Sequence, residues 1–325
     1  MRATAGASAL WAEVPCDARS PTAAPPLGEL RCSAPSKRAR TCQPTALPAQ
    51  TTHQSGMSAP DTPLLSARDL TVRFGGVVAV NKVSFDVRRG EVFTMIGPNG
   101  AGKTTVFNLI SRIYDPSAGE IQFEGRPISR LPPHRIAELG IARTFQNIEL
   151  FENASVLQNL LIGHHVHQSS GFVANLFFTP AARRAEREAR LQAERVIDLL
   201  DLQHQRDALV HGLPYGVRKV VEVARALCMG PKLLLLDEPS SGLNVEETED
   251  MAWWIRDIRK ELGVTVLMVE HDMSLVSRVS DRVLAINQGE VLALGRPAEV
   301  QAHPGVIEAY LGSADDVSGL RRKAA

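Results

Sequence analysis

A nine-residue segment between residues 97 and 105 has the residue types and the spacing of a phosphate-binding loop. It fits the pattern G-x-x-x-x-G-K-[ST] and stands between an apolar stretch at 91–96 and an apolar stripe at helical spacing from 106 to 113. Glycines let consecutive backbone N–H groups surround an anion, and a helix start adds partial positive charge. The residues expected to bind the phosphates are Gly97, Pro98, Asn99, Gly100, Ala101, Gly102, Lys103, Thr104 and Thr105.

Two side chains of this loop are expected to act on the ligand directly. The Lys103 ammonium would reach the outer phosphates as a point charge, and the Thr104 hydroxyl would ligate magnesium. The alternative is an ordinary glycine-rich turn between a strand and a helix. Because every fixed position is filled and both flanks are correct, the segment predicts binding of a nucleoside triphosphate.

A second segment ends an apolar strand with two adjacent carboxylates, Asp237 and Glu238. A parallel strand ends at the edge of the sheet where ligands bind, so Asp237 can hold magnesium through water. Glu238 would then face the space beyond the outermost phosphate and act as general base toward an attacking water. The simpler interpretation is a strand that ends in surface charge.

Three further segments carry little information when each is taken alone. Gln146 stands in a loop, where a glutamine is usually only solvated, and His271 follows the apolar strand at 264–269. The third segment precedes a helical stripe that begins at residue 217, and its residues are Leu213, Pro214, Tyr215, Gly216 and Val217.

The elements that must position these residues alternate between strands and helices. Apolar strands at 91–96, 232–236 and 264–269 alternate with helical stripes at 217–228 and 251–262, where Leu262 is the last apolar residue. Such alternation predicts an α/β fold with a parallel sheet and helices on both of its faces. The pairs 65–74 with 78–87, 121–123 with 126–128, and 283–286 with 291–294 predict antiparallel hairpins.

An all-helical subdomain is expected at about 147–230, inserted in the catalytic domain. Its first part shows no strand signal, and one helical face is apolar while Arg and Glu cover the rest. The apolar face consists of Ala189, Ala193, Val196, Ile197 and Leu200. A short apolar stretch at 171–178 is expected to be either local core or a docking surface.

The composition is that of a globular protein. The 325 residues carry no formal net charge, with 44% hydrophobic and 22% charged residues, so a general affinity for nucleic acid is not expected. No run approaches the ~20 apolar residues of a membrane span. Four cysteines without a C-x-x-C pair indicate a reducing compartment rather than a disulfide or metal framework.

The ends of the chain differ from its middle. Residues 1–56 are rich in Ala, Pro, Ser and Thr, without a helix or strand period. We interpret them as a disordered extension or as a mis-assigned start, with translation beginning at Met57, and a transit peptide fits less well. Residues 314–325 are expected to form a polar tail.

Taken in this order and spacing, residues 64–312 resemble the nucleotide-binding subunit of an ATP-binding cassette (ABC) transporter. Within that family they look most like the larger of the two ATPases of branched-chain amino acid importers. The segments that carry this likeness are Arg73–Gly76, Arg143–Gln146, Glu270–Met273 and Ala309–Gly312. The resemblance implies a P-loop NTPase core with a mixed or parallel sheet, an antiparallel β subdomain and the helical insert.

The resemblance also implies a role for each matching residue, with ATP and Mg²⁺ as the cofactors. Phe74 matches the aromatic residue that stacks on adenine, and Gln146 matches the residue that touches magnesium and relays the nucleotide state. His271 matches the switch histidine that contacts the γ-phosphate. Residues 240–244 match the loop that crosses to a partner subunit.

The partners implied by the resemblance are a second ABC ATPase subunit, identical or different, and two transmembrane permease subunits. ATP would lie between the P-loop of one subunit and the signature loop, here Leu213–Val217, of the other. The permeases would dock in a groove beside the Gln146 loop, and a secreted binding protein would act through them. This places the chain at the cytoplasmic face of the membrane, with no nucleic acid partner.

One segment departs from the family pattern. The family signature is usually Leu-Ser-Gly-Gly-Gln, whereas here Pro214 removes a hydroxyl and an N–H, and Val217 removes an amide. Our hypothesis is that the ATP site completed by this loop hydrolyses weakly; the alternative is a subfamily that uses it with full activity. Other cargoes, such as urea, amides or lipopolysaccharide, and a soluble ABC protein acting on the ribosome or DNA, remain alternative functions.

Overall fold

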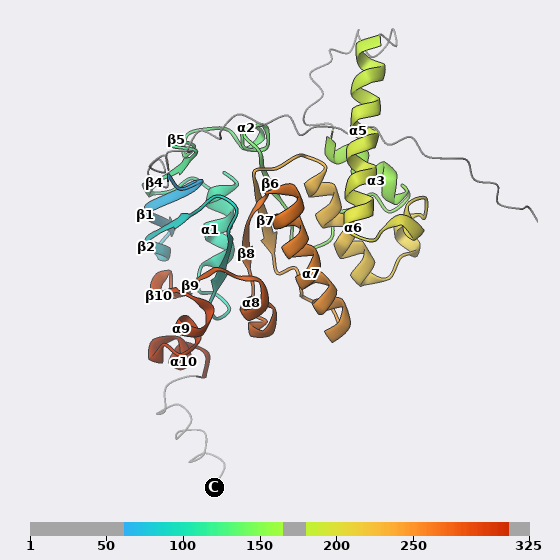
Figure 1. Cartoon of the computed structure of the whole chain (residues 1–325). Coiled ribbons are helices and arrows are strands. Elements are labelled where there is room, and N and C mark those ends of the chain that lie inside the picture. The colour runs from blue at the N-terminus through green and yellow to red at the C-terminus, as the bar shows by residue number, and fades with distance from the viewer. Residues whose placement is uncertain (1–61, 165–179, 312–325) are drawn as a thin grey trace, which may run out of the picture. The chain divides into compact units, whose positions relative to one another are not determined.

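The computed structural model describes residues 62–164 and 180–311. The expectations for residues 1–56, 171–178 and 314–325 lie outside these ranges. The described residues contain two β-sheets with helices packed against them (Figure 1).

The smaller sheet is antiparallel and has the strand order β2-β1-β4-β5. Its strands are β1 (Leu65–Phe74), β2 (Val77–Val87), β4 (Ala118–Phe123) and β5 (Arg126–Pro127). Much of β2 alternates between buried and less buried residues, because one face of the sheet covers the core. The predicted antiparallel subdomain is confirmed.

The larger sheet has six strands in the order β10-β9-β3-β8-β7-β6. They are β3 (Val92–Ile96), β6 (Ile141–Arg143), β7 (Leu233–Asp237), β8 (Thr265–Val269), β9 (Arg282–Asn287) and β10 (Glu290–Gly295). Neighbouring strands are parallel except for the hairpin of β9 and β10. The predicted mixed sheet is therefore confirmed.

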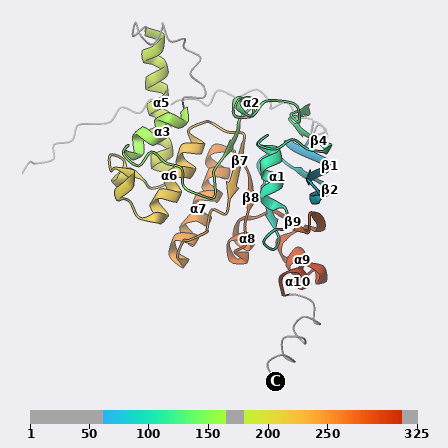
Figure 2. The same cartoon turned by 180° about the vertical axis from the view of Figure 1, so that it is seen from behind.

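The side chains of the central strands alternate between two hydrophobic cores. Leu233 and Leu235 of β7 join the core that contains α1 (Lys103–Ile110) and the smaller sheet, whereas Leu234 and Leu236 join the core on the opposite face. Because both faces are covered, these strands are continuous apolar runs. The second core contains residues of α7 (Val245–Leu262) and α8 (Met273–Val279). Figure 1 shows α7 and α8 in front of the larger sheet, and Figure 2, from behind, shows α1 in front of it.

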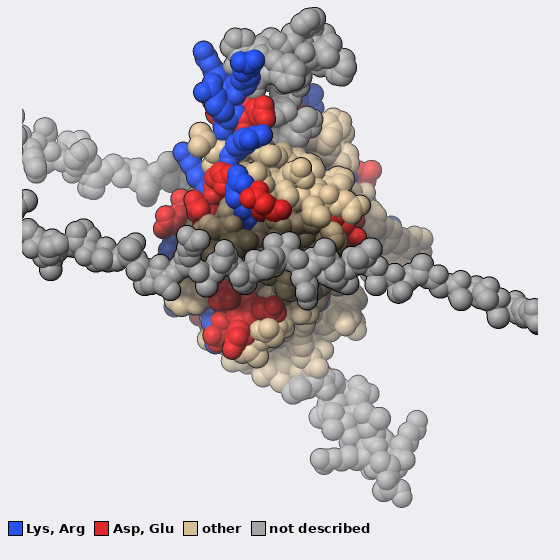
Figure 3. Space-filling view, turned by 90° about the vertical axis from the view of Figure 1, so that its right-hand side faces the viewer, with Lys and Arg blue, Asp and Glu red and all other residues tan. Residues whose placement is uncertain are grey.

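The regular elements that the structure describes between β6 and β7 are all helices, joined by loops. It contains α3 (Val156–His164), α5 (Pro180–Leu199), two short 3₁₀ helices (Gln203–Gln205 and Val210–Gly212) and α6 (Tyr215–Leu227). The five apolar residues predicted to share one face of this insert are all buried. The exposed side of α5 carries Arg together with Asp and Glu, and Figure 3 shows blue and red side chains near one another on this part of the surface.

The short helix α2 (Pro133–Glu138) lies between β5 and β6. Three short elements were not anticipated: β6, α8, and α9 (Pro297–Gln301), which precedes α10 (Pro304–Leu311). The prediction for Leu262 was wrong, since its side chain is 40% exposed in the last turn of α7. Gly263 ends that helix in a left-handed conformation (φ 64°), so Leu262 lies at the exposed end of the helix rather than over the core. In the part of the chain that is described, no helix has the length and apolarity needed to cross a bilayer.

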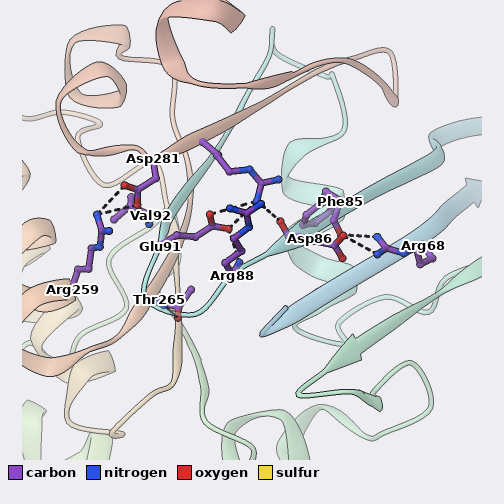
Figure 4. A network of polar contacts seen from close by, with 11 residues as sticks. Arg68, Phe85, Asp86, Arg88, Glu91, Val92, Arg259, Thr265 and Asp281 are labelled. Atoms are coloured by element: carbon purple, nitrogen blue, oxygen red, sulfur yellow. Dashed lines mark hydrogen bonds and ion pairs between the residues drawn. The ribbon is translucent and has the colours of Figure 1, made fainter. Parts of the chain in front are cut away.

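A polar network joins the two sheets at the start of β3 (Figure 4). The Glu91 carboxylate accepts a hydrogen bond of 2.6 Å from the backbone N–H of Arg88 and lies 3.3 Å from the Arg282 guanidinium. Arg282 also donates to the backbone carbonyl of Asp86 on β2. Burial raises the pKa of the Glu91 carboxyl, and the Arg88 N–H and Arg282 oppose this effect. Glu91 therefore ties the smaller sheet to β9.

We expect Glu91→Ala to lower the free energy of unfolding by about 1–3 kcal/mol, because Arg282 and the Arg88 N–H lose their acceptor. The control is Arg68→Ala, which removes an exposed ion pair with Asp86 in the same network and should cost less than ~1 kcal/mol. Urea denaturation of the full chain, followed by tryptophan fluorescence, measures both values. Equal losses in the two variants would contradict the role assigned to Glu91.

Candidate functional site

The predicted phosphate loop connects β3 to α1 at the edge of the larger sheet. Gly102 precedes α1 in a left-handed conformation (φ 101°), and a Cβ atom there would lie 2.7 Å from the backbone carbonyl of Ala79 on β2. Only glycine fits this close approach. The first backbone N–H groups of a helix have no intrahelical partner, which is what an anion site at the start of α1 requires.

Lys103 is the first residue of α1, and its side chain is folded into the loop. The ammonium donates hydrogen bonds to the backbone carbonyls of Gly97 (2.7 Å) and Pro98 (3.0 Å). Burial lowers the pKa of Lys103, and the nearby carboxylates of Glu238 and Asp237 oppose this effect. Thr104 follows at the exposed side of the same helix turn. The Lys103 ammonium is thus bound by the backbone of the loop.

Gln146 and Glu238, which are far apart in the sequence, are brought together. The amide nitrogen of Gln146 donates a hydrogen bond of 3.2 Å to the Glu238 carboxylate. Glu238 has a left-handed backbone (φ 51°) that is unusual for a residue other than glycine, and its N–H donates to the Val269 carbonyl on β8 (3.0 Å). Strain of this kind is often found at functional sites.

Asp237 is almost completely buried and is paired with Arg143 at 2.9 Å. Burial raises the pKa of the Asp237 carboxyl, and the hydrogen bond from Arg143 counteracts it. Arg143 also donates to Asn108 (2.7 Å) and Ser111 (3.1 Å), and so connects the end of β7 with α1. One carboxylate oxygen of Asp237 is therefore already hydrogen-bonded to Arg143.

His271 lies exposed after β8, in a loop that a buried carboxylate organises. Glu270 is fully buried and accepts hydrogen bonds from the backbone N–H groups of Ser240 (2.8 Å), His271 (3.0 Å) and Asp272 (3.4 Å). The loop after Glu238 and the loop that presents His271 are thus fixed to one another.

Phe74 ends β1 with its ring 46% exposed. It contacts Tyr114 edge to face, with ring centroids 5.1 Å apart. Phe74 pairs with Val77 of β2, two residues before Ala79, whose carbonyl lies against the phosphate loop. An aromatic face is therefore available close to that loop.

The segment Leu213–Val217 begins α6. Pro214 is the N-terminal cap, where its missing N–H costs nothing, and its carbonyl accepts from the Arg218 N–H at 3.0 Å. Gly216 is buried so closely against Glu247 of α7 that a Cβ atom would lie 2.3 Å from the carboxylate. Tyr215, which is exposed, lies beside Gly242. These segments pack on the loop at 240–244 of the same chain.

Several residues of this site were missed as functional candidates. Arg143, Glu222 and Glu270 appeared only as parts of motifs, and Lys219 of α6 was not singled out, although all four are buried or nearly so. The available signal was their charge: Lys219 and Glu222 interrupt an apolar helical stripe at a spacing of three residues.

The described residues contain no group of three or more His, Cys, Asp or Glu side chains that could hold a metal ion. The candidates for a metal are instead Thr104, Gln146 and Asp237, which supply one hydroxyl, one amide and one carboxylate. Such a set suits Mg²⁺, which keeps several waters and takes further ligands from phosphates.

A phosphate loop and two strand-end carboxylates on one sheet edge define a P-loop nucleotide-binding protein. Comparison with known families narrows this class. Residues 80–241 match the family described as ABC transporter, and residues 290–316 match the one described as branched-chain amino acid ATP-binding cassette transporter.

Curated relatives agree with these matches. The chain is 46% identical over 252 residues to the high-affinity branched-chain amino acid transport ATP-binding protein BraF of Pseudomonas aeruginosa, covering 78% of this chain and 99% of the relative. It is 41% identical, with the same coverage, to the corresponding protein LivG of Escherichia coli. The chain belongs to the ATP-binding cassette ATPases of ABC transporters, so the predicted family is confirmed.

Solved structures show the same fold. A nucleotide-free ATP-binding cassette from an ABC transporter matches with a TM-score of 0.68 and 30% identity, over 78% of this chain and all of that chain. A cassette in its ADP conformation matches with a TM-score of 0.67 and 29% identity, over the same shares. Nucleotide binding is thus a property of the family, as the loop predicted.

We expect Gly102→Ala to destabilise the nucleotide-free protein more than Gly100→Ala. Both glycines have positive φ, and the left-handed strain costs about 1–2 kcal/mol at either position. Only at Gly102 does a new Cβ also meet a backbone atom, whereas nothing lies within 4 Å at Gly100. That overlap should cost about 1–3 kcal/mol more. Thermal unfolding without nucleotide measures the difference, and similar losses would contradict the close approach.

Proposed function

We propose that this chain is the subunit that binds and hydrolyses ATP to energise an importer of branched-chain or related amino acids. The cargo rests on the relatives, which are named as branched-chain amino acid transport proteins and are matched over 99% of their length. Hydrolysis rests on one observation above the others: Glu238 lies at the end of a strand beside the phosphate loop, with Gln146 donating to its carboxylate.

In this proposal each site residue has a defined task. Residues 97–105 surround the phosphates, and the Lys103 ammonium moves from the loop carbonyls to the outer phosphate oxygens. Phe74 stacks on adenine. Thr104, Gln146 and Asp237 would hold Mg²⁺, which when bound neutralises charge on the phosphates.

Glu238 serves as the general base. Its carboxylate takes a proton from the attacking water, and Gln146 fixes the carboxylate in place for this step. His271, presented by the loop that Glu270 organises, contacts the γ-phosphate. All of these residues come from loops at one edge of the larger sheet.

We further propose that the site is completed by a second ABC ATPase subunit. Residues 213–217 begin α6 at the surface beside the 240–244 loop, which supports their use toward a partner. Each subunit would offer its signature loop to the ATP on the P-loop of the other.

Two permease subunits are the proposed membrane partners. A groove of about 390 Å³ lies beside the Gln146 loop, between the core and the helical insert. Its lining is largely apolar and includes Ile113, Ile136, Phe145 and Ile162. A helix of each permease, apolar on one face, suits such a groove. The chain would then be peripheral at the cytoplasmic face, with a secreted binding protein acting through the permeases.

The domain organisation that we propose follows from these roles. Residues 64–313 form the ATPase domain, with a helical subdomain at about 147–230. The helices α3, α5 and α6 within 147–230 support this division.

We expect Glu238→Gln to bind ATP and to remain as an ATP-bound dimer, since the amide cannot accept the proton from water. Size-exclusion chromatography with light scattering in Mg²⁺ and ATP measures the dimer, and phosphate release measures hydrolysis. The control is Lys103→Ala, which should neither bind ATP nor dimerise. Rapid hydrolysis by Glu238→Gln would exclude Glu238 as the base.

The departure of residues 214 and 217 from the family signature leads to a separate prediction. Restoring a hydroxyl and an amide with the double change Pro214→Ser and Val217→Gln should raise the ATPase rate of the assembled transporter. Each charge-assisted hydrogen bond regained in the closed state is worth ~1.5–3 kcal/mol. An unchanged rate would show that the loop is fully active as it stands.

A further inference from the structure

One face of α6 carries two buried charged side chains in an otherwise apolar stripe. Lys219 is 4% exposed and Glu222 is 3% exposed, and their spacing of three residues places them on the same side of the helix. Burial lowers the pKa of Lys219 and raises the pKa of Glu222, so both charges are costly at these positions. Their contacts show what offsets this cost.

The Lys219 ammonium donates a hydrogen bond to the backbone carbonyl of Glu238. The same carbonyl accepts the N–H of Ser241 at 3.1 Å. Together these bonds hold Glu238 in its left-handed conformation, and that conformation sets the direction of its side chain. Lys219 thus binds the backbone of Glu238 and leaves the Glu238 carboxylate available to Gln146.

Glu222 makes the corresponding contact with the other loop. Its carboxylate accepts a hydrogen bond of 3.0 Å from the backbone N–H of Phe145, the residue before Gln146. The position of Gln146 therefore depends on Glu222, just as the position of Glu238 depends on Lys219.

Three hydrogen bonds and one turn of α6 form a closed ring. Gln146 binds the Glu238 side chain, Lys219 binds the Glu238 backbone, Glu222 binds the backbone beside Gln146, and one helix turn joins Lys219 to Glu222. Both ends of the Gln146–Glu238 hydrogen bond are thereby fixed to one rigid element.

We propose that Lys219 and Glu222 are positioning residues that hold Glu238 and Gln146 in register for hydrolysis. The proposal rests on the roles suggested above for Glu238 and Gln146. Neither residue is assigned a contact with nucleotide. A change at either residue should therefore lower the ATPase rate while ATP affinity stays nearly the same. The helix that offers the signature loop to a second subunit also sets the geometry of this chain's own water-activating pair.

The experiment measures ATP affinity and the ATPase rate in the membrane complex purified from cells. Lys219→Met and Glu222→Met should each lower kcat about ten- to a hundredfold, while the Kd for ATP changes less than about threefold. Lys219→Arg and Glu222→Gln keep a donor and an acceptor, and should recover most of the loss. Lys232→Met removes a half-exposed ammonium that donates to the Glu124 carboxylate at 2.8 Å, far along the sheet from Glu238, and should leave kcat within about twofold.

A second comparison uses the Glu238→Gln background. If Lys219 acts through Glu238, then adding Lys219→Met to Glu238→Gln lowers the residual rate no further. A further fall, or a loss of ATP affinity as large as the loss of kcat, would overturn the proposal. Should Lys219→Met not fold, Lys219→Gln provides the same test with a shorter donor.

Failure of the proposed base is distinguishable from failure of this inference. If Glu238→Gln alone retains the wild-type rate, Glu238 is not the base. If Glu238→Gln is inactive but Lys219→Met and Glu222→Met hydrolyse ATP normally, only the positioning role is wrong.

Discussion

The buried ion pair between Arg143 and Asp237 is the interaction on which the site depends. Taking two charges out of water is costly, and close geometry with additional hydrogen bonds must offset that cost. Here the pair is 2.9 Å apart, and Arg143 also donates to Asn108 of α1 and to Ser111, the C-terminal cap of that helix. The guanidinium lies over the Phe107 and Phe145 rings, at 5.6 and 5.3 Å from their centroids. One side chain thus joins β6, β7 and the helix that follows the phosphate loop.

Around that pair, the parallel register of the larger sheet brings the loops of the candidate site together. Asp237 pairs with Val269 across β7 and β8, and Met95 of β3 pairs with Val269 on the other side. Hydrogen bonds continue this register beyond the strands, from Glu238 N–H to the Val269 carbonyl and from Glu270 N–H to the Met95 carbonyl. Consequently the phosphate loop, the segment with Asp237 and Glu238, and the loop that presents His271 all lie at one edge of the sheet.

Much of this arrangement could be predicted from the sequence because it depends on local patterns. Continuous apolar runs identified β3, β7 and β8, and the rule that ligands bind where parallel strands end placed Asp237 and Glu238 at the phosphate loop. The family resemblance assigned Gln146 to magnesium, whereas its hydrogen bond to Glu238 was not predicted and came from the structure.

The charged residues that hold the site could not be predicted in the same way. Periodicity identifies apolar faces, and a lysine or glutamate within such a face, such as Lys219 or Glu222, is indistinguishable from a solvated one until its partner is known. Those partners are backbone groups 19 and 77 residues away along the chain. The strand β6 that carries Arg143 has only three residues, too few to show alternation.

The same contacts explain why the fold accepts an altered signature. Pro214 occupies a cap where no N–H is needed, and Val217 packs against the apolar core instead of holding α6 through a polar bond. The polar contacts of α6 come from the next turns, through Lys219, Glu222 and the bond from Arg225 to the Glu149 carbonyl. These polar contacts of α6 do not involve the side chains of residues 214 and 217. We therefore expect the departure at residues 214 and 217 to affect what this loop would offer to the proposed second subunit, and to leave the chain's own phosphate loop unchanged.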